Sequence, residues 1–380
     1  MTTGPAATSA LGAYEPSLDG LRGMCIAAVV LFHVCAMSGL GGWFRGGFIG
    51  VSVFFTLSGF LITSLLLREH AASGTIRLRT FWARRIRRLW PASLVAVIAV
   101  VVLSAVGTLS ARSSDAIAAA WNITNWHVIA GGEEHLLQTI VGPLGPTWSL
   151  AVEEQFYLVL ALLLVAITRL PRARHALTAV SLVGMVVPVV LSNSITDWQP
   201  TLEFHTVLRM PELFAGVLLA VWMRTDRAPR PTRAAADAMV AGGSLALIGL
   251  FLFADYTPPW LLRGGYVVVA LTTVLVIVGL LQRGRSATAF STWPLRPLGV
   301  ISYSLYLVHW PVVLVLTTHR GGLDAVPLML AMVAASVAAA VVLHLAVERP
   351  IRRMSSPDLP TIAVGLGAVG VVTVASLVLL

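Results

Sequence analysis

The sequence predicts an all-α fold, a transmembrane bundle of about 10–11 helical spans, and its composition and hydropathy pattern support this fold class. Of the 380 residues, 57% are hydrophobic and only 11% are charged, and the mean hydropathy is +0.86. Soluble domains carry about 25% charged residues, so an ordinary soluble enzyme and a disordered chain are both excluded. The apolar residues also fall into runs of about 20 residues, the length of helix that crosses a bilayer.

Eleven such runs follow one another along the chain. The expected spans are 21–41, 47–67, 90–109, 147–168, 175–192, 202–223, 236–253, 265–281, 297–317, 324–347 and 359–380. These spans imply a cytoplasmic tail at 1–20, a membrane domain at 21–347, and a cytoplasmic loop with an additional membrane helix at 348–380. The longest connection, 110–146, is expected at the outer interface of the membrane.

The distribution of the arginines predicts the topology. All 26 basic residues are arginines, and the formal net charge is +9. With a cytoplasmic N-terminus, most of them fall in cytoplasmic loops, which membrane proteins enrich in arginine. Basic residues that bind nucleic acid gather on one solvated face, whereas these arginines form short clusters between apolar runs. We therefore expect the lipid bilayer as a partner and no nucleic acid. Arginine without lysine indicates a GC-rich bacterial genome, hence a multi-pass protein of the bacterial plasma membrane.

Polar residues inside the expected spans are the first candidates for function, because each costs a few kcal/mol in lipid and normally faces a cavity or a partner. The helical rise of about 1.5 Å per residue places five of them at a similar level: His33, Glu153, Arg209, Glu212 and His309. Arg209 and Glu212 are three residues apart, which puts them on one helix face as an expected ion pair. The alternative is that all five are satisfied structural groups, but their common level favours a functional cavity.

A second set of candidates lies in the cytoplasmic segment FWARRIRRLWP, residues 81–91. Arg85 and Arg88 are three residues apart and would share a helix face. A planar guanidinium suits bidentate binding of phosphate. The alternative is that these arginines only anchor the protein to anionic lipid headgroups.

Seven motifs then occur in order along the chain: LDGLRGMCIAAVVLFHV, GGFIGVSVFFTLSGFLIT, FWARRIRRLWP, TWSLAVEEQFYL, RMPELFAG, ISYSLYLVHWPV and VERP. In this order they resemble the acyltransferase-3 family of integral membrane O-acyltransferases, in its stand-alone transmembrane form, over nearly the whole chain. The resemblance implies transfer of an acyl group, commonly acetyl, from cytoplasmic acyl-coenzyme A to a hydroxyl of a glycan or of a glycoside such as a macrolide. It implies that His33 is the catalytic histidine and that Arg22, Arg85 and Arg88 hold the donor. Ser52 stands where the family often has an aspartate.

The candidate residues suit this chemistry. A neutral imidazole at His33 can accept the proton of the hydroxyl as a general base, and Glu153 could orient the imidazole. His309 or Arg209 could stabilise the oxyanion or hold the acceptor, and Glu212, Trp148 and Tyr303 would support the substrate or the transition state. A relay in which His33 is itself briefly acylated is an open alternative.

The competing function is a proton-coupled transporter or exporter, because intramembrane histidines and carboxylates also relay protons. The motifs and the paired cytoplasmic arginines favour acyl transfer, and an inverted repeat of the kind found in many transporters is missing. No metal is expected, because His127, Glu133, Glu134 and His135 fit no familiar zinc spacing.

Three further features of the sequence are expected to have structural roles and no part in the reaction. Cys25 and Cys35 are about 15 Å apart along one expected helix and cannot form a disulfide with each other. GLGAVG at residues 365–370 lies within an apolar run, where small residues serve helix packing. His344 is expected in the core, and Glu348 is expected to pair with Arg349.

Overall fold

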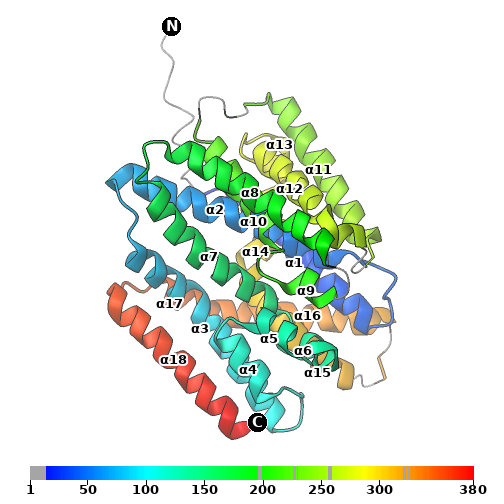
Figure 1. Ribbon diagram of the computed structural model, residues 1–380. Coiled ribbons are helices and arrows are strands. Elements are labelled where there is room, and N and C mark those ends of the chain that lie inside the picture. The colour runs from blue at the N-terminus through cyan, green and yellow to red at the C-terminus, as the bar shows by residue number, and fades with distance from the viewer. Residues whose placement is uncertain are drawn as a thin grey trace. The chain divides into compact units, whose positions relative to one another are not determined.

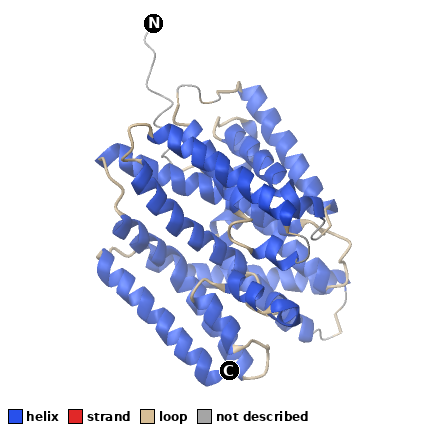
Figure 2. Ribbon diagram, viewed as in Figure 1, coloured by secondary structure: helices blue, strands red, loops and turns tan. Residues whose placement is uncertain are grey.

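The computed structural model describes residues 14–195, 199–225, 228, 230–255, 259–319, 322–323 and 325–380, without the side chains of residues 133–137 and 199–200. All regular structure in these residues is helical (Figure 2). Within them, nine helices are long and apolar enough to cross a membrane, and Met210–Trp222 and Ser302–Thr318 are shorter apolar helices. Each of these eleven helices falls on one of the eleven expected runs, so the polytopic all-α membrane fold is confirmed.

The chain divides into two compact units. Unit 1 comprises Met1–Cys25, Gly46–Ile76 and Gln155–Val300, and unit 2 comprises Ile26–Arg45, Arg77–Glu154 and Ile301–Leu380. Two helices, α1 (Pro16–Met37) and α7 (Thr147–Ile167), contribute residues to both units. Cys25 and Cys35 of α1 are both buried free cysteines, as expected.

Unit 1 is formed mainly by the second apolar run and by the fourth to eighth runs. Its other helices are η2 (Gly47–Ile49), α2 (Gly50–Ser73), α8 (Ala173–Ser194), α9 (Gln199–Phe204), α10 (Met210–Trp222), α11 (Arg233–Phe253), η3 (Leu261–Gly265), α12 (Tyr266–Leu280), α13 (Arg285–Phe290) and α14 (Leu295–Val300). Its two central helices, α2 and α10, meet backbone to backbone. A Cβ on Gly59 would lie 2.0 Å from the carbonyl oxygen of Leu213, and one on Gly216 would lie 2.1 Å from that of Thr56. Only glycine permits this close approach.

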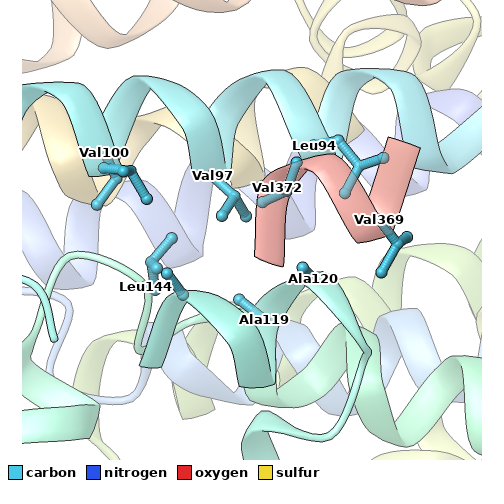
Figure 3. Packing of buried hydrophobic residues seen from close by; sticks show 10 residues of the cluster. Leu94, Val97, Val100, Ala119, Ala120, Leu144, Val369 and Val372 are labelled. Atoms are coloured by element: carbon cyan, nitrogen blue, oxygen red, sulfur yellow. The ribbon is translucent and has the colours of Figure 1, made fainter. Parts of the chain in front are cut away.

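Unit 2 contains the remaining helices. They are α3 (Leu78–Ala105), α4 (Ser113–Ala120), α5 (Thr124–Ala130), α6 (Gly132–Val141), α15 (Ser302–Thr318), α16 (Ala325–Leu343), η4 (His344–Glu348), α17 (Arg349–Arg353) and α18 (Asp358–Leu379). The C-terminal helix α18 runs alongside α3 (Figure 1). Between them Leu94 and Val97 of α3 meet Val369 and Val372 of α18 and the alanines of α4 (Figure 3).

Glycine again sets a helix contact in unit 2. A Cβ on Gly365 would lie 2.7 Å from the Cγ2 atom of Ile86 and 3.2 Å from the ring of Trp90, whereas one on Gly367 or Gly370 would meet no atom of the described structure within 4 Å. The helix-packing interpretation of GLGAVG is therefore confirmed for its first glycine.

Three segments differ from the expected pattern. The run 202–223 is split, because α9 ends at Phe204 and α10 begins only at Met210, with Pro211 in its first turn; proline is favoured there. Residues 110–146, for which the sequence suggests at most one short helix, form three short helices, α4 to α6. Helix α3 begins at Leu78, so the arginine motif at 81–91 lies inside a helix that continues through Pro91.

Candidate active site

Unit 2 brings two of the predicted residues into direct contact. His33 comes from α1 and His309 from α15, and the Nδ1 atom of His33 lies 3.3 Å from the Nε2 atom of His309. His309 is completely buried, while His33 is only partly buried. The pair therefore has one enclosed ring and one ring that a substrate can approach.

The groups around the two rings assign their tautomers. The Nδ1 atom of His309 faces the carbonyl oxygens of Tyr306 at 2.8 Å and Leu305 at 3.1 Å. A carbonyl only accepts, so this Nδ1 carries the proton and the Nε2 atom of neutral His309 is an acceptor. The Nδ1 atom of His33 faces that acceptor and, at 2.9 Å, the carbonyl of Val29. Neutral His33 is thus protonated at Nδ1, which leaves the lone pair on its Nε2 atom.

Aromatic side chains hold the ring of His33. The ring centroids of Phe32, Trp310 and His309 lie 4.9, 4.8 and 5.0 Å from that of His33. The indole of Trp310 is itself fixed, because its Nε1 atom donates a 2.9 Å hydrogen bond to the carbonyl of Gly142. The imidazole of His33 is therefore held on three sides by rigid groups.

A hydroxyl pair lies next to His309. The hydroxyl of Tyr306 donates to the carbonyl of Pro146 at 2.7 Å and lies 2.7 Å from the hydroxyl of Ser149. Because the proton of Tyr306 is taken by the carbonyl, Ser149 donates to Tyr306. The ring of Tyr306 is 5.7 Å from that of His309, so these bonds tie the start of α7 to the helix that carries His309.

Two further predicted residues lie on α7. Trp148 and Glu153 are partly buried, and the Glu153 carboxylate interacts electrostatically with Tyr306. The hydrogen bonds of the His33 ring within the described structure run to Val29 and His309. An orienting role for Glu153 stays a prediction.

A small pocket opens beside these residues. Its lining includes Ser93, Val97, Pro146, Thr147, Tyr306 and Trp310. Its volume of about 10 Å³ is room for on the order of one water molecule. The pocket is therefore too small for an acyl donor.

The predicted ion pair of Arg209 and Glu212 is confirmed in unit 1. Their Nη2 and Oε1 atoms are 2.9 Å apart, and both side chains are at most 2% exposed. Arg209 also donates to the hydroxyl of Ser52 at 2.8 Å, and its Cζ atom lies 3.7 Å from the ring centre of Tyr266. A buried arginine needs such partners to offset its desolvation. Participation of this pair in substrate binding stays a prediction.

The three predicted donor arginines have different surroundings. Arg22 is partly buried in unit 1, where its Nη1 atom lies 3.6 Å from a carboxylate oxygen of Asp19. Arg85, on α3 of unit 2, is buried and donates through Nε and Nη2 to Oε1 of Glu154, both at 3.3 Å. Arg88 is exposed on the same helix. Arg85 already has a carboxylate partner that a phosphate would have to replace.

Two polar networks of unit 2 were not predicted from the sequence. In the first, buried Glu348 accepts hydrogen bonds from Ser304 at 2.7 Å and from His344 at 2.9 Å. Its further ionic partner is Arg352, at 3.6 Å, and not Arg349, because adjacent helical residues do not face each other. His344 is buried, as expected. Nearby, the hydroxyl of predicted Tyr303 donates to the carbonyl of Leu89 at 2.8 Å.

The second network joins α4, α5 and α6 around buried Asp115. Arg112 donates to both carboxylate oxygens at 3.0 Å, and His127 and Thr139 bond the same carboxylate at 3.0 and 3.1 Å. Burial alone would raise the pKa of Asp115, but the hydrogen bonds of His127, Arg112 and Thr139 and the charge of Arg112 outweigh it and lower the pKa to about 2. The spacing of three residues between Arg112 and Asp115 is a signal in the sequence, but His127 and Thr139 are identified as partners only by the three-dimensional structure.

Groups that could hold a metal ion are not found among the described side chains. His127, one of the four residues weighed as ligands, is bonded to Asp115. The side chains of Glu133, Glu134 and His135 lie outside the described residues.

Comparison with known proteins identifies a matching family and several similar proteins. A family model described as an acyltransferase domain matches residues 15–345. O-acetyltransferase OatA of Staphylococcus aureus strain NCTC 8325 / PS 47 is 31% identical over 318 residues, which cover 80% of this chain and 52% of OatA. The putative O-acetyltransferase SAS0844 of S. aureus strain MSSA476 is 32% identical over 317 residues, which cover 79% of this chain and 51% of SAS0844. The chain spans about half the length of these relatives. The search of solved structures found no match.

Proposed function

Because this chain belongs to the acyltransferase family whose model matches residues 15–345, we propose that it is a membrane O-acyltransferase. It transfers an acetyl or other short acyl group from acyl-coenzyme A to a hydroxyl of a glycan or of a glycosylated secondary metabolite such as a macrolide. The names of the relatives, which are O-acetyltransferases, support an acetyl group and an oxygen acceptor. The contact between His33 and His309 is the observation that carries the proposal.

His33 acts as the general base. Its Nε2 lone pair takes the proton of the acceptor hydroxyl while the hydroxyl oxygen attacks the thioester carbonyl carbon. The tetrahedral intermediate collapses, the carbon–sulfur bond breaks, and the proton passes from His33 to the sulfur of coenzyme A. Without acceptor, the same Nε2 could attack the thioester directly, so trapping of an acyl-histidine distinguishes the relay from direct transfer.

His309 holds His33 in the reactive tautomer. Its only ring proton is taken by the carbonyls of Leu305 and Tyr306, so neutral His309 has no N–H to offer an oxyanion. Its Nε2 atom instead accepts from His33 and stabilises the imidazolium that forms during transfer, the part that a carboxylate plays in a catalytic triad. We propose that Glu153, which interacts electrostatically with Tyr306, acts on the site through that side chain.

The ion pair of Arg209 and Glu212 fixes helices of unit 1. Arg209 is enclosed by Glu212, Ser52 and Tyr266, which joins α2, α10 and α12 of unit 1. Ser52 supplies a neutral acceptor where the family often has an aspartate, so Arg209 faces a single carboxylate among these partners. We also propose that Trp148 of α7 and Tyr303 of α15 support the substrate or the transition state.

The donor enters from the arginine-rich side, which the topology predicted from the sequence places in the cytoplasm. Arg22 of unit 1 is partly buried and Arg88 of unit 2 is exposed, and each is proposed to contact the phosphates of coenzyme A. Arg85 contributes positive charge from its buried pair with Glu154.

The test uses the full chain purified into lipid vesicles. Wild-type protein is incubated with acetyl-coenzyme A and a panel of hydroxyl-bearing glycans and glycosides, and the products are analysed by mass spectrometry. We expect a mass gain of one acetyl group on at least one acceptor and a higher unfolding temperature when acetyl-coenzyme A is bound. Vesicle uptake or export of sugars without acetylation and without this thermal shift would instead support the transporter.

A further inference from the structure

Residues 138–147, the connecting segment, run from the end of α6 to the start of α7 and are bound by α15. Trp310 and Tyr306 of α15 are four residues apart, which puts them on one face of the helix. The indole nitrogen of Trp310 donates to the carbonyl of Gly142 at 2.9 Å, and the hydroxyl of Tyr306 donates to the carbonyl of Pro146 at 2.7 Å. Two backbone carbonyls of the connecting segment therefore fix two side chains next to the histidine pair.

The connecting segment is itself closely packed. A Cβ on Gly145 would overlap the carbonyl oxygen of Ile140, so the turn folds tightly back on the end of α6. Leu144 packs into the core formed by α3, α4 and α18, beside Ala119 (Figure 3). The hydroxyl of Thr147 donates to the carbonyl of Leu144 at 2.6 Å. Because packed structure transmits displacements, a shift at the start of the segment moves its carbonyls as well.

Thr139, near the start of the connecting segment, is held by the buried carboxylate of Asp115. Its hydroxyl donates to the Oδ1 atom of Asp115 at 3.1 Å and accepts from the Nη2 atom of Arg112 at 2.6 Å. The Nη1 atom of Arg112 donates to the side-chain oxygen of Gln138 at 3.1 Å, and His127 of α5 bonds the same carboxylate. A carboxylate of α4 thus fixes the segment three residues before the carbonyl that holds the indole.

The indole held by the connecting segment in turn contacts the catalytic imidazole. The ring centroids of Trp310 and His33 are 4.8 Å apart, and His309, the residue before Trp310, faces the Nδ1 atom of His33 at 3.3 Å. A shift of the indole therefore changes the space that fixes the imidazole and the direction of its Nε2 lone pair. All of these residues belong to unit 2.

We propose that Asp115 is a positioning residue for His33. It acts through the hydroxyl of Thr139, the carbonyl of Gly142 and the indole of Trp310. The proposal rests on the proposed acyl transfer, in which His33 is the general base. Asp115 changes the alignment of the base and leaves the binding of donor and acceptor as it is, so its loss lowers kcat and not the affinity for either substrate.

A double-mutant cycle between the two ends of this path tests the proposal, with the full chain in lipid vesicles. Thr139→Val removes the hydroxyl, and Trp310→Phe removes the indole N–H but keeps an aromatic ring. Each variant should lower kcat roughly tenfold, with KM for donor and acceptor unchanged. The double variant should lose little more than either single variant, because both changes interrupt the same path. Asp115→Asn should behave like Thr139→Val.

Trp121→Phe is the matched control. The indole nitrogen of Trp121 donates to the hydroxyl of Thr373 at 3.1 Å, so the same N–H group is removed from the end of α4, and kcat should keep its wild-type value. Losses that multiply in the double variant of Thr139 and Trp310, or an equal loss in Trp121→Phe, would overturn the assignment. A lower unfolding temperature of Thr139→Val with unchanged kcat would do the same, because the network would then only stabilise α4 to α6.

Modification of His33 by diethyl pyrocarbonate measures its positioning without acyl transfer. The rate of carbethoxylation at His33, mapped by mass spectrometry, should rise severalfold in Thr139→Val, in Trp310→Phe and in the double variant alike, because a loosened ring is easier for the reagent to reach. This rise supports the positioning role even if no acceptor is acetylated. A wild-type rate in both single variants would overturn the role whether or not the protein transfers acyl groups.

Discussion

The Nδ1 atom of His33 lies 3.3 Å from the Nε2 atom of His309, although 276 residues separate the two histidines along the chain. The carbonyls of Leu305 and Tyr306 fix the proton of His309 on its other nitrogen. The acceptors that orient His33 are therefore a second histidine and the carbonyl of Val29.

Replacement of His309 tests this orientation. In His309→Leu the Nδ1 proton of His33 keeps only the carbonyl of Val29 as acceptor. The imidazolium formed during transfer is then less well stabilised, and kcat should fall about a hundredfold with KM for the acyl donor unchanged. In His309→Gln the side-chain carbonyl can still accept from His33, so most of the activity should return. Equal loss in both variants, measured by steady-state kinetics, would mean that His309 does not act through a hydrogen bond to His33.

The buried ion pair of unit 1 should matter for stability. Glu212→Gln leaves the Arg209 charge in the core without its carboxylate, and we expect a loss of about 3–5 kcal/mol, seen as a lower thermal unfolding temperature in detergent. Glu15→Gln is the control. The Glu15 side chain is 8% exposed, but its partner Arg283 is 60% exposed, so water solvates the charge that is left behind and the loss should be smaller, about 1 kcal/mol. Similar losses of stability in both variants would contradict the larger contribution expected of the buried pair of Arg209 and Glu212.

The crossing of α2 and α10 predicts a strong effect of one added methyl group. Gly59→Ala would put a Cβ 2.0 Å from the carbonyl oxygen of Leu213, so the helices must separate. We expect a clear fall in the yield of folded protein and in its unfolding temperature. Gly242→Ala is the control, because a Cβ there meets no atom of the described structure within 4 Å and alanine favours a helix by about 1 kcal/mol. A Gly59→Ala variant with the folded yield and unfolding temperature of the wild type would contradict the close packing of α2 against α10.

Asp115 gives a pH dependence outside the membrane spans. Its pKa is lowered from 3.8 to about 2 in the folded protein. A carboxylate with a lowered pKa contributes stability that is present above its unfolded pKa and is lost as the pH falls through its folded pKa. The network of α4 to α6 should therefore lose roughly 2 kcal/mol between pH 4 and pH 2.

Pepsin cleavage within residues 110–132 measures this loss in acid. In Asp115→Asn the segment should be cleaved more readily at pH 4, and the additional increase between pH 4 and pH 2 should shrink. A wild-type segment that is equally resistant at both pH values would show that Asp115 does not hold it.

Hydropathy alone located all eleven apolar helices, because each apolar run is long enough to be recognised without knowledge of its neighbours. The break before Arg209 was not predicted, because the hydropathy of 202–223 as a whole does not show where α10 begins. Pro211 in the first turn of α10 is the sequence signal that could have indicated it. The pair Arg209 and Glu212 was predictable because its partners are three residues apart on one helix.

Contacts between side chains from distant segments of the chain could not be predicted from the sequence. Estimated depth placed His33 and His309 at one level, but a level does not specify which side chains meet. Glu154 is 69 residues from Arg85, and no spacing rule joins them. Arg85 was accordingly assigned to the donor without its carboxylate, and the hydrogen bond from Ser304 to Glu348 was not predicted.

The most direct test of the account is acetyl transfer by His33→Gln. The variant keeps a side chain of similar shape but has no basic nitrogen, so transfer from acetyl-coenzyme A to the acceptor should fall at least roughly a hundredfold. Its unfolding temperature and its stabilisation by coenzyme A should match the wild type. Mass spectrometry of the acceptor gives the readout, and acetylation at the wild-type rate would contradict the assignment of His33 as the general base.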